Sequence, residues 1–138
     1  MEVNFTDKCL EKIKRHSMRG YPSEVCGFLV GEKEGWRVEE VIDSKNVANS
    51  KMLFEIGSKK ILEVLEKVEE SGFKLLGFYH SHPTGSANIS ERDLKFMKLW
   101  PEKLWVILGV NQSGVKEIST YIDEEEVEEV GIEKNSTF

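Results

Sequence analysis

Cysteine, proline and histidine are scarce in this sequence. Its 138 residues include two cysteines, three prolines and three histidines. Cys9 and Cys26 are too few for a disulfide framework and lack the C-x-x-C spacing of a metal or redox pair. We expect both to be buried free thiols, with a single disulfide between them as the open alternative. Any bound metal ion must therefore find other ligands.

Long apolar runs and an excess of basic residues are also absent. No segment approaches the about 18 apolar residues that span a bilayer, and the N-terminus lacks the basic and apolar regions of a signal peptide. We therefore expect a cytoplasmic protein without a membrane partner. The net charge of −6 and the acidic run Asp123 to Glu129 argue against a nucleic-acid partner. The run fits either a partner with a basic face or a solvated surface.

The composition favours one folded domain over residues 1–138. The chain is 39% hydrophobic and 32% charged, which is typical of a globular protein rather than a disordered one. A domain of this length buries about two thirds of the surface that its unfolded chain exposes. The sequence shows no repeat, no low-complexity linker and no boundary to a second domain.

Helix caps and apolar spacing predict three helices. They are expected at residues 7–19, 58–71 and 90–100. Gly72 closes the second helix and Pro101 stops the third. On the second helix, a buried stripe is predicted from four apolar residues: Ile61, Leu62, Leu65 and Val68.

Apolar runs and alternating patterns predict six strands between these helices. They are expected at residues 25–30, 36–42, 52–56, 73–82, 104–110 and 115–122. Gly35 marks a hairpin turn between the first two. The strand at 73–82 is so apolar that both its faces should be covered, which makes it central. Residues 125–133 fit helix or strand equally. The fold class is α/β, a mixed sheet with flanking helices, with Phe78, Trp100 and Trp105 in its core and His16 partly exposed.

Two of the three histidines, His80 and His82, end the most apolar strand. Residues i and i+2 of a strand point to the same face, so both imidazoles can converge on one ion. An isolated H-x-H pattern is equally consistent with two polar side chains at the solvent-exposed end of a strand that bind no metal. This pair alone does not decide between the two interpretations.

Asp93 completes a candidate ligand set. Pro83 stops the strand, Gly85 lets the chain reverse, and a helix that starts at Ser90 would bring Asp93 back toward the strand end. Two imidazoles and one carboxylate leave a fourth tetrahedral position open, as in catalytic zinc sites. Ser90 and Asp93 also have the spacing of a capping box, which is the structural alternative. The neighbouring H-x-H favours a metal ligand.

The pattern Gly77-Phe-Tyr-His80-Ser-His82-Pro83, followed by Ser90 and Asp93, resembles the signature of the JAMM (MPN+) zinc metalloproteases, archaeal single-domain type. In that family a glutamate lies far upstream beside the first core strand. Glu24, in the segment Pro22-Ser-Glu24-Val-Cys-Gly27, matches it in context. The resemblance spans residues 24–93. Ile89 departs from the family, whose members commonly carry proline before the serine, and this puts the rigidity of the loop in question.

The resemblance implies a JAMM/MPN fold, similar in layout to cytidine deaminases, and a Zn²⁺ ion held by His80, His82 and Asp93. It also implies that Glu24 accepts a proton from the attacking water and that Ser90 donates its hydroxyl to the oxyanion. Metal, carboxylate and hydroxyl are each chemically suited to these steps. A deaminase itself is disfavoured because its H-x-E and P-C-x-x-C patterns are absent, and a zincin because H-E-x-x-H is absent.

From the resemblance we expect an isopeptidase that removes a ubiquitin-like modifier from target proteins by hydrolysis after its C-terminal Gly-Gly. Two alternatives belong to the same family: a peptidase that trims the C-terminus of a sulfur-carrier protein, and a non-catalytic MPN scaffold. The intact ligand set speaks against a pure scaffold. The expected partners are modifier proteins and their conjugates, and a homodimer is left open.

Overall fold

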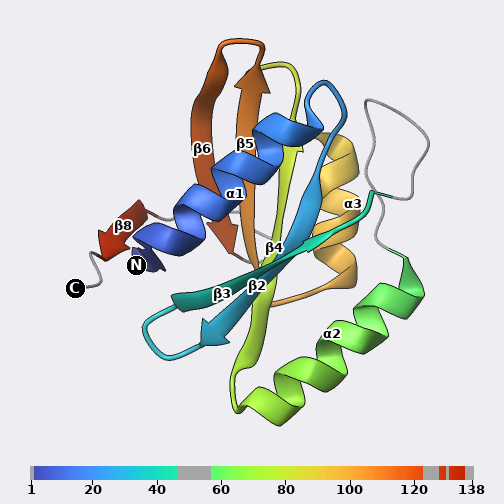
Figure 1. The fold of residues 1–138 in the computed structure, drawn as a ribbon, viewed down its shortest axis with the longest axis vertical. Helices are drawn as coiled ribbons and strands as arrows, with labels where there is room; N and C mark the ends of the chain where they lie inside the picture. Colours follow the sequence, from blue (N-terminus) through green and yellow to red (C-terminus); the bar gives the residue numbers. More distant parts are fainter. Residues whose placement is uncertain (1, 47–56, 123–127, 130, 136–138) are drawn as a thin grey trace.

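The computed structural model describes residues 2–46, 57–122, 128–129 and 131–135. Within them, eight strands form one sheet in the order β7-β6-β5-β4-β2-β3-β1-β8 (Figure 1). The strands are β1 (Glu2–Thr6), β2 (Cys26–Glu32), β3 (Arg37–Ser44), β4 (Lys74–His82), β5 (Leu104–Asn111), β6 (Gly114–Ile122), β7 (Glu128–Glu129) and β8 (Gly131–Asn135). The strand predicted at 52–56 lies outside the described residues.

In the described part of the chain, three helices cover the two faces of this sheet. They are α1 (Asp7–Gly20), α2 (Ser58–Ser71) and α3 (Glu91–Leu99), close to their predicted bounds. Leu10 and Ile13 of α1 belong to one buried cluster, whereas Val64 of α2 and Met97 of α3 belong to a second. The prediction of a mixed sheet with flanking helices is therefore confirmed. Of the described helices, none is both long and apolar enough to traverse a bilayer.

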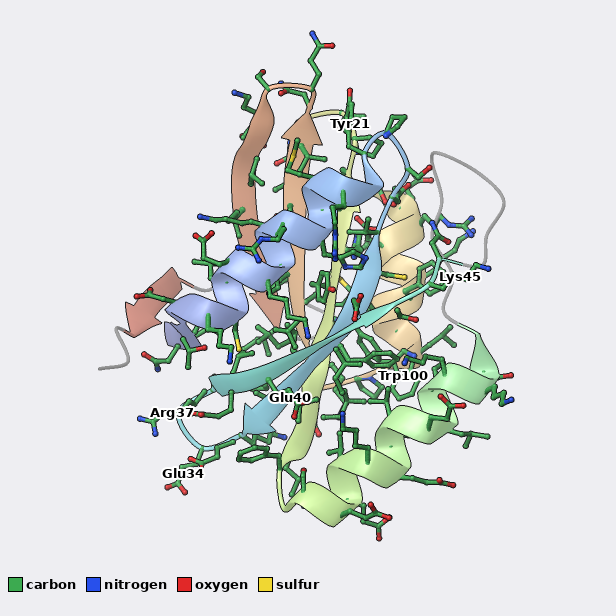
Figure 2. The ribbon with its side chains drawn as sticks, viewed as in Figure 1. Tyr21, Glu34, Arg37, Glu40, Lys45 and Trp100 are labelled. Atoms are coloured by element: carbon green, nitrogen blue, oxygen red, sulfur yellow. The ribbon has the colours of Figure 1, made fainter. Side chains whose placement is uncertain are left out.

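Strand β4 is central, as its composition predicts. Antiparallel β2 lies on one side of it and parallel β5 on the other. Its residues 75–81 are buried, because both faces are covered by helices. Phe78 and Trp105 are buried. Trp100, labelled at the end of α3 in Figure 2, packs against Phe78 with ring centroids 5.1 Å apart. This aromatic cluster joins α3 to the strand that carries the two histidines.

The predicted buried stripe of α2 is wrong in part. Leu62 and Leu65 are 61% and 38% exposed, whereas Val64 and Val68 are buried and Ile61 is half-buried. Residues 61, 64 and 68 follow the spacing of one helix face, and each leucine lies one position, or about 100°, around the helix from it. The helix contacts the sheet along this narrower face.

Strand β1 is absent from the sequence-based prediction. Val3 and Phe5 alternate with polar residues and are fully buried, and β1 pairs in parallel with β3 and β8. The alternation was too short to be distinguished from the approach to α1. The described parts of 125–133 lie in strands, which settles the helix-or-strand question for them. Cys9 and Cys26 are free and buried, and His16 is half-buried, as predicted.

Candidate metal and catalytic site

The two candidate histidine ligands lie at the C-terminal end of β4. His80 pairs with Ile107 of β5, and His82 with Gly109. Their ring centroids are 5.0 Å apart. His80 is fully buried, and this burial lowers its pKa despite the opposing effect of Asp93, so its imidazole is neutral at physiological pH. A neutral imidazole is the form that binds a metal ion.

The first turn of α3 places Asp93 opposite both rings. Its Oδ1 lies 2.8 Å from Nε2 of His80, and its Oδ2 lies 3.1 Å from Nε2 of His82. Burial alone would raise the pKa of Asp93, but hydrogen bonds from the two imidazoles hold it well below its usual range. The carboxylate is therefore ionised, as a metal ligand must be.

Ser90 and Asp93 also form the capping box that the sequence offered as the alternative. The Asp93 N–H donates to Ser90 Oγ at 3.1 Å, and the Ser90 N–H donates to Asp93 Oδ2 at 2.9 Å. The two interpretations are compatible, because the cap fixes the carboxylate in the orientation that faces the histidines. The Ser90 hydroxyl accepts in this cap and keeps its own proton for donation.

The loop between His82 and α3 rests on β5 and β6. A Cβ atom at Gly109 would collide with the backbone of Gly85, so only a glycine lets the loop lie this close to β5. The buried residue Ala87 is held at both polar groups: its N–H donates to Glu117 Oε1 at 2.9 Å, and its carbonyl accepts from Tyr121 Oη at 3.0 Å. These contacts set the return path of the chain from His82 to Asp93.

The same loop orients the His82 ring. Nδ1 of His82 lies 3.2 Å from the carbonyl oxygen of Ser86. A carbonyl only accepts, so Nδ1 carries a hydrogen and donates it to Ser86, which leaves Nε2 as the ring atom that faces Asp93. Nε2 donates to the Asp93 carboxylate here, and it would bind a metal ion after losing that proton. Burial lowers the pKa of His82, but Asp93 and Glu24 outweigh it and leave this pKa raised.

These three side chains fit a divalent cation. Candidate ligand atoms of His80, His82 and Asp93 all lie within 4.8 Å of one another. Two imidazole nitrogens and one carboxylate oxygen are a donor set that suits Zn²⁺ and leaves a coordination position open. The structure thus brings together the residues that the sequence grouped.

Glu24 lies beside this cluster, in the segment that precedes β2. Its side chain is buried, with 6% of its surface exposed. Burial raises its pKa to about 7, while the charges of His82 and Arg92 lower it and that of Asp93 raises it. The charges of His82 and Asp93 act on the pKa of Glu24 because its carboxyl group lies near both residues. A carboxyl group there, with a pKa close to neutral pH, can exchange a proton at the cluster.

The sequence did not single out the residues that hold this site in shape. Gly109 stands inside an apolar strand, and Glu117 and Tyr121 lie on β6, distant in sequence from the histidines. No motif marks them. Gly109 offered the one local signal, because glycine within a strand often marks a close backbone approach.

Comparison with known proteins finds relatives along most of this chain. Residues 6–121 match the family model Prok-JAB, the prokaryotic homologs of the JAB domain. The chain is 35% identical over 109 residues to a desampylase from Pyrococcus furiosus, a match that covers 79% of this chain and 74% of the relative. It is 38% identical over 87 residues to a probable TtuB-protein conjugate cleaving protease from Thermus thermophilus, covering 62% of this chain and 57% of the relative.

Two solved structures share the fold. A Desulfitobacterium hafniense protein has a TM-score of 0.86 and 25% identity, and the match covers 100% of this chain and 95% of that one. A JAB1/MPN domain protein from Archaeoglobus fulgidus has a TM-score of 0.63 and 20% identity, covering 94% and 98%. The resemblance seen in the sequence is confirmed: this chain belongs to the Prok-JAB family and has the JAMM/MPN fold.

Proposed function

We propose that this chain is a zinc-dependent isopeptidase that removes a ubiquitin-like modifier from target proteins by hydrolysis after its C-terminal Gly-Gly. The observation that carries the proposal is the convergence of His80, His82 and Asp93 beside the buried Glu24. The names of the relatives support the substrate class, since one is a desampylase and another a probable TtuB-protein conjugate cleaving protease.

The metal ligands are His80, His82 and Asp93. Nε2 of each histidine and the Asp93 carboxylate face one another, and Ser86 and Ser90 fix their orientation. A bound Zn²⁺ would supply Lewis acidity, which polarises a carbonyl and makes water more acidic.

Glu24 moves the proton. Its carboxylate takes a proton from water as the water oxygen bonds to the carbonyl carbon of the last glycine. It then gives that proton to the lysine nitrogen as the C–N bond breaks. The products are the carboxylic acid of the last glycine and the lysine amine, and transfer of the acid's proton to the amine leaves a carboxylate and an ammonium group. Burial supports this role, because with no metal bound it raises the pKa of Glu24 to about 7, and a carboxyl group held near neutral pH can both accept and return a proton.

Ser90 stabilises the negative charge that develops on the carbonyl oxygen. Its hydroxyl accepts from the Asp93 N–H, which fixes the oxygen, and it donates its own hydrogen to the substrate. A donor fixed before the reaction costs little reorganisation when the charge appears.

The test is cleavage of a modifier fused through its Gly-Gly tail. Two substrates distinguish the enzymatic alternatives: one joins the tail to a lysine side chain, and the other extends it by a linear peptide. We expect cleavage of the lysine-linked substrate after Gly-Gly, loss of cleavage with chelator, and recovery on addition of Zn²⁺. Cleavage of the linear substrate alone would favour the sulfur-carrier processing peptidase. Cleavage of neither would favour the scaffold.

A further inference from the structure

The peptide group between Glu24 and Val25 is held at both of its polar atoms by side chains. Its carbonyl, that of Glu24, accepts from Nδ2 of Asn46 at 2.9 Å. Its N–H, that of Val25, donates to Oγ of Ser81 at 2.9 Å. Both atoms belong to one rigid plane, so these two hydrogen bonds together fix the plane's orientation.

This double contact lies where the backbone ladder ends. The pairing of β2 with β4 reaches Cys26 opposite His80, and β2 begins at Cys26. Ser81 extends the pairing by one residue, because its own N–H donates to the carbonyl of Val25 at 3.0 Å. The residue next to Glu24 is thus tied, at both its N–H and its carbonyl, to the residue between the two histidines.

Ser81 has no role as a metal ligand in this arrangement. It is fully buried, and alternation along β4 turns it away from the face shared by His80 and His82. Its hydroxyl is instead committed to Val25. A serine here therefore links two parts of the site: the strand that carries the histidines and the segment that carries the proton acceptor.

We propose that Ser81 and Asn46 are positioning residues that aim the Glu24 carboxylate at the metal cluster. The proposal rests on the proposed role of Glu24. The orientation of the peptide that follows Glu24 determines where its Cα–Cβ bond points relative to β4. Displacement of a reacting group by about 1 Å can cost roughly 10²-fold in rate, so loss of this restraint should slow the chemical step.

A purely structural role makes a different forecast. If Ser81 only stabilises the start of β2, its loss should lower stability and leave the turnover of folded, zinc-loaded protein unchanged. The experiment therefore compares Ser81→Ala with Ser81→Thr, which keeps the hydroxyl, and with Ser17→Ala as a matched control. Ser17 is also fully buried, and its hydroxyl donates to the Ile13 carbonyl at 2.9 Å within α1.

Turnover is measured for the lysine-linked Gly-Gly substrate, with zinc content measured alongside. We expect Ser81→Ala to bind one zinc and to lower kcat about 10- to 100-fold with KM little changed. Ser81→Thr should recover most of the rate, and Ser17→Ala should lose none. In a Glu24→Gln background, Ser81→Ala should change the residual rate less than about 2-fold, because two residues that act through one group are not additive. An equal loss in both backgrounds, or loss of zinc, would overturn the proposal.

A second readout is independent of activity. In metal-free protein, hydrogen exchange of the Val25 amide should accelerate at least about 10-fold in Ser81→Ala and stay unchanged in Ser17→Ala. Unchanged exchange at Val25 would refute the restraint itself, whereas a wild-type chain that cleaves neither substrate would refute the proposed function. If Ser81→Ala does not fold, Asn46→Ala, a change at a half-buried position, is compared in the wild-type and Glu24→Gln backgrounds instead. The same loss of kcat is expected, and an unaltered kcat would again refute the restraint.

Discussion

Gly109 of β5 and Gly85 of the loop that follows His82 meet backbone to backbone, with no room for a Cβ atom on Gly109. This contact lets the loop between the histidines and Asp93 lie flat on the sheet. Gly85 has a φ of +86°, a conformation that favours glycine and turns the chain back toward α3.

Gly109→Ala should therefore displace the loop and weaken metal binding. We expect zinc affinity to fall by about 10-fold or more and the free energy of unfolding to drop by roughly 1–3 kcal/mol. The control is Val110→Ala. Val110 is the buried neighbour of Gly109 and belongs to the same core cluster as Leu10 and Ile13 of α1, so this variant should lose stability without losing zinc affinity. Competition with a chelator measures the affinity. Equal zinc affinity in the two variants would disprove the effect of this contact on the site.

The metal site itself is tested by removal of its ligands. We expect one tightly bound zinc per wild-type chain and none in His80→Ala/His82→Ala, because one carboxylate alone holds zinc weakly. The remaining histidine, His16, lies on α1 with its Nδ1 2.6 Å from Oη of Tyr79, so His16→Ala should keep its zinc. Elemental analysis decides, and stoichiometric zinc in the double variant would show that the ligand assignment is wrong.

The raised pKa of Glu24 predicts a pH-dependent stability of the metal-free protein. Its pKa is about 7 in the folded chain against an ordinary 4.5, so the folded state holds this proton more tightly than the unfolded state does. Stability should then fall as pH rises from about 4.5 to 7. Glu24→Gln removes this contribution and should be more stable than wild type by roughly 1–3 kcal/mol at pH 8, with little difference near pH 4. Urea unfolding in the presence of chelator measures the free energy of unfolding of both proteins at each pH. A stability difference between Glu24→Gln and wild type that does not vary with pH would contradict the raised pKa of Glu24.

The geometry of Ser90 allows two roles at once, donor to the oxyanion and cap of α3, and substitutions at this position can distinguish them. If its hydroxyl donates to the substrate, Ser90→Ala should lower kcat about 10²-fold with KM little changed. If it serves only as a helix cap, the same change should cost about 1 kcal/mol of stability and spare the turnover of folded protein. Ser90→Gly is the companion variant, since glycine is tolerated at this position but cannot donate from a side chain. A stable and fully active Ser90→Gly enzyme would rule out the oxyanion role.

Most of the fold could be predicted from local patterns. Caps and apolar spacing marked the three helices, with Ser90 at the start of α3 and Gly72 at the end of α2, and the apolar composition of β4 indicated its central position. The prediction of the buried face of α2 was wrong in part, because tertiary packing decides which residues of a helix contact the sheet. The four apolar residues chosen on α2 did not include Val64, and only the packed structure shows that this face, rather than Leu62 and Leu65, contacts the sheet.

The candidate site divides in the same way. His80, His82 and Asp93 were found because strand alternation and a loop reversal are local properties. The choice of Glu24 among the many acidic residues rested on family resemblance, and its burial now gives that choice a physical basis. Ser81, Asn46 and Gly109 act through contacts between distant segments, which no spacing in one sequence reveals.

The most direct test of the account is the Glu24→Gln variant under single-turnover conditions with the lysine-linked Gly-Gly substrate. The amide keeps the size of the side chain but cannot accept a proton, so we expect full zinc content, a folded chain and a rate lowered by about 10²-fold or more. Glu11→Gln, a change at an exposed glutamate on α1, should retain the wild-type rate. A zinc-loaded Glu24→Gln protein that cleaves at nearly the wild-type rate would contradict the central claim that Glu24 moves the proton at this site.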